Sequence, residues 1–454
     1  MRKNTYNLEF KLFLSGSTAW IGIAILLITG FAGLYFGKSF IDNQHSVIKK
    51  ASILQTENTL KNVEHFGKDI GLVFFHNKFS MANLPGNWAG FAIGQRDVNP
   101  YLISATMLAL EGQIYDTDIT NPVTLLSGNM DISFVFLYLF PLVIIAFTYN
   151  LISELKEFGI WSVLRAQTNH IIAVIWQKLL VRLVSILFTA LILLTTAVLY
   201  LNIKLDTTLF TITLLLLLYL GFWFALSFCI ISLGKSSNYN ASALIAIWVL
   251  ICIVIPAALN LVLIRQYPIP EALQNVINQR EGYHEKWDMP KEVTMKPFFA
   301  HYPQLRKFPF PSDKSFSWFW YYGMQQMGDD QAIKSKKAME NKLDARQHFT
   351  KVAALFFPTI QTQLMLNEMA GTDLSAHLQF QESYRKYHEQ VRLHFYPAIF
   401  LEQDIHRTNL KDIGLKQFIP QKKSNLNGLL SIAVITLLLI AMSLFNFRKA
   451  RLIR

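Results

Sequence analysis

Six long stretches of this 454-residue chain contain no Asp, Glu, Lys or Arg. The hydrocarbon core of a bilayer is about 30 Å thick, and a helix rising about 1.5 Å per residue needs roughly 20 apolar residues to cross it. All six stretches meet this length: 12–37, 132–153, 183–203, 207–234, 236–264 and 424–447. Backbone N–H and C=O groups find no water in lipid, so these stretches must satisfy them internally as helices. The sequence therefore predicts an all-α membrane protein with six transmembrane helices.

The composition agrees with this class, since 52% of the residues are hydrophobic and 16% are charged. The first stretch is too long for the core of a signal peptide, and we interpret it as an uncleaved first span. Both cysteines, Cys229 and Cys252, lie inside predicted spans. A disulfide framework is therefore not indicated.

The distribution of Lys and Arg predicts the orientation, because these residues are enriched in short loops on the cytosolic side. The N-terminus, the loops between spans 2 and 3 and between spans 4 and 5, and the C-terminal tail together hold 12 Lys and Arg against 3 Asp and Glu. The loop between spans 3 and 4 holds one of each, Lys204 and Asp206. We expect a multi-pass protein of the bacterial cytoplasmic (inner) membrane with both termini in the cytosol.

The formal net charge of +12 comes mostly from these cytosolic flanks, which carry a net 9 of the 12 positive charges. Topology and anionic lipid headgroups account for such a bias, so we expect contact with membrane lipids and no nucleic-acid partner.

Two long segments, 38–131 and 265–423, are then extracytoplasmic and mainly helical. The expected organisation is an interfacial helix with span 1 in 1–37, the first outer segment in 38–131, spans 2 to 5 in 132–264, the second outer segment in 265–423, and span 6 with a basic tail in 424–454. Helical spacing of apolar residues predicts a stalk at 39–66 and helices at 332–357, 359–369 and 374–394, separated by Pro358, Gly371 and Pro397. Irregular structure is expected at 83–121.

Eight aromatic residues lie between Phe308 and Tyr322. Aromatic rings favour membrane interfaces and also fill domain cores. A gate or substrate vestibule at the interface is one interpretation. Packing in a domain core, or docking onto the bilayer, is the other, and we favour it.

Sequence motifs for catalysis are absent. The two near matches to a phosphate-binding G-x-x-x-x-G-K-[ST] loop have Ala32 and Cys229 in place of the first glycine and lie at span ends. His388 and His394 are six residues apart, whereas two histidines on one helix face that bind zinc are four apart. We interpret Asp329 and Asp330 as the acidic start of a helix. The sequence thus predicts no enzyme activity, no metal site and no cofactor in this chain.

The segment between spans 2 and 3 reads SELKEFGIWSVLRAQ from Ser153, and Lys178 follows it. It resembles the first cytosolic loop of type-2 ATP-binding-cassette (ABC) permeases, which carries S-E-x-x-E-x-G-[TS]-L-x-x-L-L and then a lysine at the foot of span 3. Ile160 and Trp161 replace the usual Thr-Leu. The resemblance implies a coupling helix at about 153–165 that docks into a separate ATPase subunit. The residues it assigns to this contact are Glu154, Glu157, Phe158, Gly159, Leu164, Arg165, Gln167 and Lys178.

Further residues carry the same resemblance: Asn121, Pro122, Gly128, Asp131, Pro141 and the run 325–330. With the order of spans and large outer segments, they look like an uncharacterised branch of that family, related to the permease of nitrous-oxide-reductase maturation. The resemblance implies a permease subunit of an ATP-driven exporter. It would pair with a second copy or a paralogue and with two ATPase subunits, which would bind the ATP and Mg.

Two other functions remain open. The chain could be a membrane-anchored interaction or mechanotransmission protein whose outer segments bind a partner without forming a transport path. An intramembrane enzyme is disfavoured, because no span holds an obvious polar constellation and the six stretches contain no ionisable residue of the kind that marks ion paths.

Overall fold

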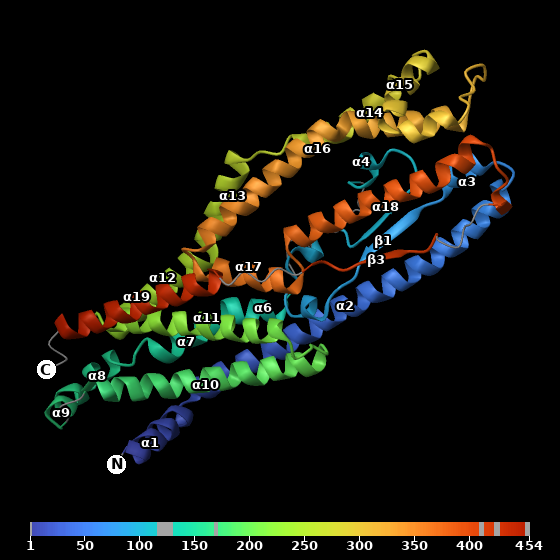
Figure 1. The fold of residues 1–454 in the computed structure, drawn as a ribbon. Coiled ribbons are helices and arrows are strands. Elements are labelled where there is room, and N and C mark those ends of the chain that lie inside the picture. Colours follow the sequence, from blue (N-terminus) through green and yellow to red (C-terminus); the bar gives the residue numbers. More distant parts are fainter. Residues whose placement is uncertain (1, 116–129, 168–170, 408–412, 422–426, 450–454) are drawn as a thin grey trace.

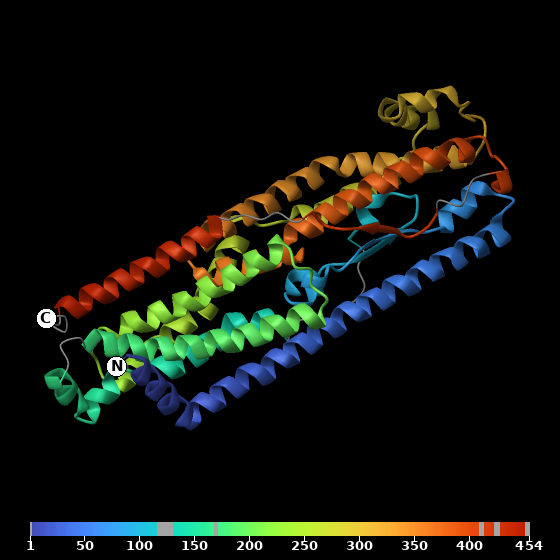
Figure 2. The ribbon, with the colours of Figure 1, turned by 60° about the horizontal axis from the view of Figure 1, so that its bottom comes forward.

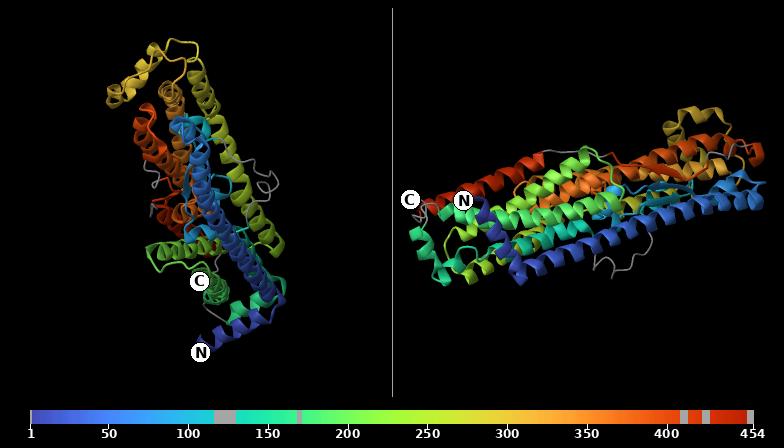
Figure 3. Two further views of the ribbon diagram at one scale, coloured as in Figure 1. Left: turned by 90° about the vertical axis from the view of Figure 1, so that its right-hand side faces the viewer. Right: turned by 90° about the horizontal axis from the view of Figure 1, so that it is seen from below.

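A computed structural model describes residues 2–115, 130–167, 171–407, 413–421 and 427–449 (Figure 1). Six of its helical segments are long and apolar enough to cross a membrane, which confirms the prediction of an all-α membrane protein. We call them spans 1 to 6: Ser17–Phe66, Ile132–Glu157, Ala173–Tyr200, Thr207–Ile231, Ser237–Gln266 and Asn427–Lys449. Both chain termini lie at one end of the bundle, here called the near end (Figures 1 and 3). Elements beyond the opposite end form the distal body.

Span 1 belongs to a single 50-residue helix, α2 (Ser17–Phe66), that continues out of the bundle along the whole distal body (Figure 2). The predicted stalk at 39–66 is therefore confirmed. A shorter helix, α1 (Arg2–Ser15), precedes it and turns away at Gly16, whose backbone is extended. A Cβ atom on Gly37 would collide with the carbonyl of Gly90 in η1 (Asn87–Gly90), so glycine is required where α2 passes this loop.

Spans 2 and 5 are each interrupted by a π-helical turn just before a proline. Because proline lacks an N–H, it leaves a carbonyl one turn earlier without its usual donor, and a π-turn relieves the mismatch. Pro141 and Pro256 are the prolines. Span 2 comprises α6 (Ile132–Phe134), η3 (Val135–Leu139), α7 (Phe140–Thr148) and α8 (Ser153–Glu157), and span 5 comprises α12 (Ser237–Val249), η4 (Leu250–Val254) and α13 (Ile255–Gln266).

The remaining spans are uninterrupted helices: α10 (Ile171–Tyr200), α11 (Thr207–Ile231) and α19 (Asn427–Lys449). Span 4 is the centre of the bundle. In its most apolar 18-residue stretch, 72% is buried inside the protein, whereas the corresponding value for span 5 is 6%. Span 5 is therefore the span with the least protein around it within the described chain.

The distal body is built on two long helices that run between the bundle and its far tip, α16 (Trp318–Ala354) and α18 (Leu374–Phe400). Helix α14 (Glu271–His284) packs along α16, and α17 (Pro358–Ala370) connects α16 to α18 at the bundle. Its other elements are α3 (Ile70–His76), η2 (Gly94–Asp97), α4 (Leu110–Gln113), α15 (Lys291–His301), η5 (Pro303–Lys307) and η6 (Ile405–Arg407).

A small sheet joins the two outer segments. Strand β1 (Phe79–Asn83) lies between β2 (Leu102–Ala105), to which it is antiparallel, and β3 (Lys416–Phe418), to which it is parallel. Tyr384 of α18 covers this sheet, since its hydroxyl donates to the Phe79 carbonyl and accepts from the Ala105 N–H. The part predicted as irregular thus contains β2 and α4, and residues 116–129 lie outside the described chain.

Helix boundaries in the second outer segment differ in part from the prediction. Helix α16 begins at Trp318, after Ser317 caps it by accepting the Trp320 N–H, so Asp329 lies in its interior and the interpretation of a helix start is wrong. Gly371 ends α17 at φ 70°, as predicted. Pro397 does not end α18, which continues to Phe400.

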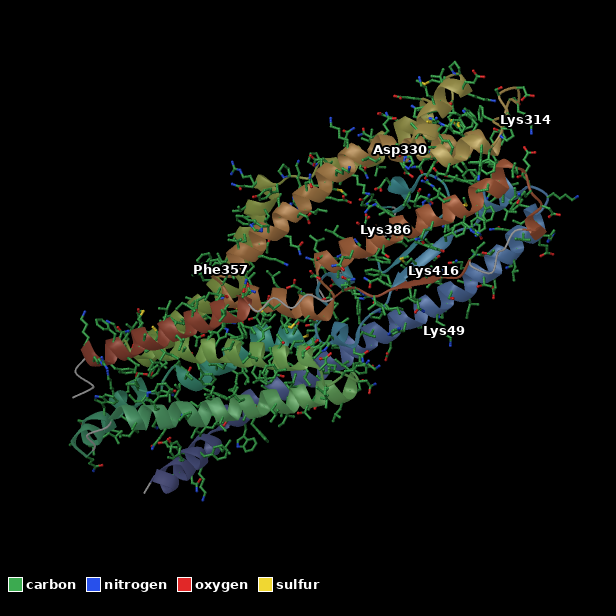
Figure 4. The ribbon with its side chains drawn as sticks, in the orientation of Figure 1. Lys49, Lys314, Asp330, Phe357, Lys386 and Lys416 are labelled. Atoms are coloured by element: carbon green, nitrogen blue, oxygen red, sulfur yellow. The ribbon has the colours of Figure 1, made fainter. Side chains whose placement is uncertain are left out.

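The aromatic cluster belongs to the core of the distal body. Phe319, Trp320 and Tyr322 are buried there, and Phe319 stacks on Phe400 with ring centroids 3.7 Å apart. This region lies at the far tip, close to the labelled Lys314 in Figure 4 and remote from the bundle. The core interpretation is confirmed, and the position excludes a gate at the membrane interface.

A buried ion pair fixes the loop before α4 to both long helices. Arg392 of α18 donates to the Asp329 carboxylate at 2.8 Å and to the carbonyls of Met107 and Leu108. Asp329 also accepts the N–H of Leu110 at 2.7 Å. Burial alone would lower the pKa of the Arg392 guanidinium, but Tyr396 and Asp329 outweigh it and raise that pKa. Burial prevails at the other partner and raises the pKa of the Asp329 carboxyl, although Arg392 and two backbone N–H groups oppose the shift. The pair is enclosed with its hydrogen bonds largely satisfied.

A second ion pair lies beside it. Glu111 in α4 accepts from Arg385 of α18 at 2.8 Å, with Lys336 of α16 3.7 Å away. Burial would raise the pKa of the Glu111 carboxyl, but the hydrogen bond and charge of Arg385 prevail and lower it. The polar core of the distal body therefore joins α4, α16 and α18.

We expect Asp329→Asn to destabilise the protein by about 3 kcal/mol or more, because it leaves the buried Arg392 charge unpaired. The matched control is Asp330→Asn on the next residue, which is partly exposed, pairs with a surface histidine, and should cost less than about 1 kcal/mol. Thermal unfolding of the purified full chain in detergent measures both. Equal effects would contradict the assigned role of Asp329.

Candidate functional site

The end of span 2 and the segment that follows it form two short helices, α8 and α9 (Ile160–Gln167), at the near end of the bundle. Helix α8 ends at Glu157, and α9 begins three residues later. Gly159 lies between them at φ 73°, a left-handed conformation that costs other residues roughly 1–2 kcal/mol. The expected single helix at 153–165 is therefore wrong in one respect: a sharp bend divides it.

Glycine at 159 is required for its backbone conformation and not for space. A Cβ atom there would meet nothing within 4 Å. The space next to Gly159 is open, so a partner could approach the backbone closely at this residue.

Helix α8 is bonded to the turn between spans 4 and 5. Lys156 donates to the Gly234 carbonyl at 3.0 Å, and the Glu157 carboxylate accepts the Ser237 N–H at 3.0 Å. The hydroxyls of Ser153 and Ser237 are 2.7 Å apart. Glu157 thus caps the N-terminus of α12. A force on α8 would reach spans 2, 4 and 5 together.

The other residues that the resemblance assigns to the ATPase contact do not share one surface or one partner. Glu154 accepts a local hydrogen bond from Asn150. Lys178 is on α10 and pairs with Glu9 of α1 at 3.5 Å, so it ties α1 to span 3 and does not reach α8 or α9. Leu164 is half-buried and Gln167 is exposed.

Some residues of the resemblance lie outside what the structure describes: the Arg165 side chain, Asn121, Pro122 and Gly128.

An apolar surface is exposed on both sides of the bend. Phe158 is 72% exposed, and Ile160 and Val163 are also exposed. Trp161 instead turns inward onto the bundle core, with the Lys156 ammonium 5.6 Å from its ring. The near end therefore presents three exposed apolar side chains around the bend.

A second site, which the sequence did not predict, joins α17 to the middle of the bundle. The Tyr219 hydroxyl of span 4 donates to the Leu137 carbonyl of span 2 at 2.7 Å, and it lies 3.2 Å from the Thr359 hydroxyl of α17. Leu137 is four residues before Pro141, which has no N–H, so the usual i+4 donor to the Leu137 carbonyl is missing. Cys252 of span 5 lies 3.9 Å from Thr359.

This polar junction connects α17 with three spans, and it corrects the expectation that no span takes part in a polar constellation. A related contact satisfies the neighbouring carbonyl, since the Trp248 indole of span 5 donates to Tyr138 at 3.2 Å. The prolines at 141, 256 and 358 were the sequence features that could have pointed to this junction. Their side-chain partners come from distant positions, so spacing could not reveal them.

The histidines of the distal body have structural partners. His388 is buried and donates to the Thr106 carbonyl at 2.7 Å. His301 of α15 pairs with Asp330 of α16 at 2.9 Å. Among the described residues, no three His, Cys, Asp or Glu side chains are grouped to hold a metal ion.

Comparison with known proteins gives one result. A protein-family profile, described as a domain of unknown function (DUF3526), matches residues 273–417. The match covers most of the second outer segment and includes α16, α17 and α18. No curated protein and no solved structure gave a match.

We expect Tyr219→Phe to destabilise the bundle by about 1–2 kcal/mol, because the Leu137 carbonyl then has no donor inside the membrane. Thr359→Val is the matched control: it removes the second hydroxyl but leaves the Tyr219 to Leu137 bond, and should cost less. The unfolding midpoint in detergent measures both. An unchanged midpoint for Tyr219→Phe would mean that another group donates to the Leu137 carbonyl, and would contradict the role assigned to Tyr219.

The His301 to Asp330 pair should make the tip more stable at acid pH. The hydrogen bond and charge of Asp330, with the charge of Glu389, raise the pKa of His301, while burial and Arg392 oppose this. A raised pKa stabilises the folded state below the ordinary value of 6.5, and this contribution is lost as the pH rises through the folded-state value. Hydrogen exchange in α15, corrected for intrinsic rates, should therefore be slower at pH 6 than at pH 8. His301→Gln should remove the difference, and a difference that persists would contradict the pair.

Proposed function

We propose that this chain is the membrane-spanning permease subunit of an ATP-driven ABC exporter. The observation that carries the proposal is the exposed apolar surface of Phe158, Ile160 and Val163 on a segment bonded to spans 2, 4 and 5. Buried apolar anchors supply most of the binding energy in protein interfaces. A partner that binds this segment tightly and moves would displace spans 2, 4 and 5 together.

The partner in this proposal is a separate ATPase in two copies, which supplies the ATP and Mg sites. The resemblance of 153–167 to the coupling loop of type-2 ABC permeases supports this assignment. Gly159 then sets the angle between α8, which is fixed to the bundle, and α9, whose exposed face would enter the partner. The near end would lie in the cytosol with both termini.

Helix α1 fits the same arrangement. Arg182 at the foot of span 3 donates to the Phe147 carbonyl at 2.6 Å and lies over the Phe13 ring, 5.2 Å from its centroid. With the Glu9 to Lys178 pair, these contacts hold α1 against spans 2 and 3. Motion of the coupling segment would thus also reach span 1.

A second candidate is a membrane-anchored protein that transmits force between the bundle and a partner at the distal tip. Helix α17 favours it, because this helix contacts spans 2, 4, 5 and 6 and is continuous through short turns with α16 and α18. This candidate needs no ATPase at the near end. The presence or absence of an ATPase there therefore distinguishes it from the permease proposal.

A photo-crosslinking residue at position 158 tests the proposal in native membranes. The expected adduct is a protein with an intact G-x-x-x-x-G-K-[ST] loop. The control is the same residue at Leu205, an equally open apolar position between spans 3 and 4 at the other end of the bundle. Adducts with lipid alone at 158, or with the ATPase at 205, would contradict the proposal.

Phe158→Asp should weaken the complex by about 2 kcal/mol, roughly 30-fold in Kd, if Phe158 is an anchor. Leu205→Asp should leave the affinity unchanged. Gly159→Val should also weaken binding through backbone strain, whereas Gly159→Asn should retain more of it, since Asn tolerates the left-handed conformation. Co-purification and nucleotide-stimulated ATP hydrolysis provide the measurements.

A further inference from the structure

We propose that the corner between α16 and α17, residues 352–357, lies inside the hydrocarbon of the leaflet on the side of the distal body. Its exposed side chains, Val352, Leu355 and Phe356, would contact lipid acyl chains. The segment would thus be a re-entrant part of what the sequence assigns to an outer segment. The inference is independent of the proposed transport function.

Span 5 gives the depth of this corner. Thr359, three residues after Phe356, lies 3.9 Å from Cys252. Cys252 is 15 residues beyond Ser237, where α12 begins just after Lys235, so it lies about 22 Å along a helix that starts at the near surface. The hydrocarbon is about 30 Å thick. Thr359 is then roughly 8 Å below the distal surface.

Spans 4 and 6 give two further references for the level of α17. The Tyr219 hydroxyl, 3.2 Å from Thr359, belongs to a residue 12 positions from Thr207, or about 18 Å below the distal end of α11. Gly428 of span 6 packs so closely on Gln361 and Met365 of α17 that a Cβ atom would collide with both. Spans 4 and 5 therefore both place Thr359 below the distal surface, and span 6 begins beside Gln361 and Met365 of α17.

The charge pattern matches a short dip into the membrane. Residues 352–367 contain no Asp, Glu, Lys or Arg, a run too short to cross the bilayer but long enough to enter and leave it. Lys351 and Glu368 flank the run and pair with each other at 3.2 Å. The two ends of the uncharged run therefore lie at the same depth relative to the membrane. The Lys351 side chain is partly exposed there.

Exposure divides the run into a protein-facing side and an outward-facing side. Thr359, Ile360 and Thr362 are buried against the spans, whereas Phe356 is 71% exposed and Val352 and Leu355 are also exposed. Figure 4 labels Phe357 at this corner, beside the start of α19. At this depth the surrounding medium is acyl chain, which removes the cost of exposing apolar area to water.

The backbone N–H groups at the corner have partners within the chain. The N–H groups of Leu355, Phe356 and Phe357 bond to carbonyls three residues earlier, at 3.3, 3.1 and 3.0 Å. Backbone polar groups inside the hydrocarbon must find partners within the protein, and these three N–H groups do.

Spin labelling of the full chain in phosphatidylcholine and phosphatidylglycerol vesicles tests the proposal. A label is attached at Phe356→Cys, and Ile333→Cys, an exposed apolar position higher on α16, is the matched control. Relaxation by oxygen, which concentrates in hydrocarbon, is compared with relaxation by a water-soluble nickel chelate. The unmodified chain, whose two cysteines are buried, gives the labelling background.

Oxygen should dominate at 356 and nickel at 333, so that the ratio of the two effects reverses between these positions. Dominance of nickel at 356 would place the corner in water and overturn the proposal. An immobilised label that neither reagent reaches would show that protein, such as a second copy of the chain, covers the corner, and would overturn the lipid contact equally.

Discussion

The bundle depends on one requirement: each polar group inside the membrane must find its partner within the protein. Pro141 removes the usual helical donor to the Leu137 carbonyl, and the Tyr219 hydroxyl of span 4 donates a hydrogen bond to that carbonyl instead. Because that same hydroxyl lies within hydrogen-bonding distance of Thr359, the repair of span 2 also fixes α17. A local defect in one helix has thus become the point where the bundle and the distal body meet.

The distal body solves the opposite problem, since it surrounds charges with protein instead of lipid. Arg392 and Arg385 project from one face of α18, and each has its own carboxylate, Asp329 and Glu111. Both carboxylates also fix α4, one by accepting its N–H groups and the other as part of the helix. The ion pairs therefore specify how the loop from the first outer segment sits between α16 and α18, a registry role that apolar packing alone would leave less defined.

Much of this architecture could be read from the sequence, and the exceptions have a common cause. Uncharged runs identify the spans because the length of a spanning helix is set by the bilayer. The stalk at 39–66 and the end of α17 at Gly371 follow from local periodicity and local backbone preference. Asp329 was misassigned because its role is set by Arg392, which is 63 residues away in sequence. Tyr219 and Thr359, 140 residues apart, escaped notice for the same reason. The bend at Gly159 is a local feature, but a glycine in a helical pattern does not by itself reveal a positive φ.

The position of β3 has a consequence for biogenesis. This strand pairs with β1, although more than three hundred residues separate Met81 from its partner Lys416. The sheet cannot be completed until nearly the whole chain has been synthesised and the second outer segment lies on the same side of the membrane as β1. Until then β1 has an open edge, and the long α2 stalk extends beyond the bilayer without most of its partners. Long-range pairing of this kind is slow to form and leaves strand edges prone to association. Insertion of span 6 directly after β3 brings the end of the chain back to the bundle, so that closing the sheet and completing the bundle become the last, linked steps of assembly.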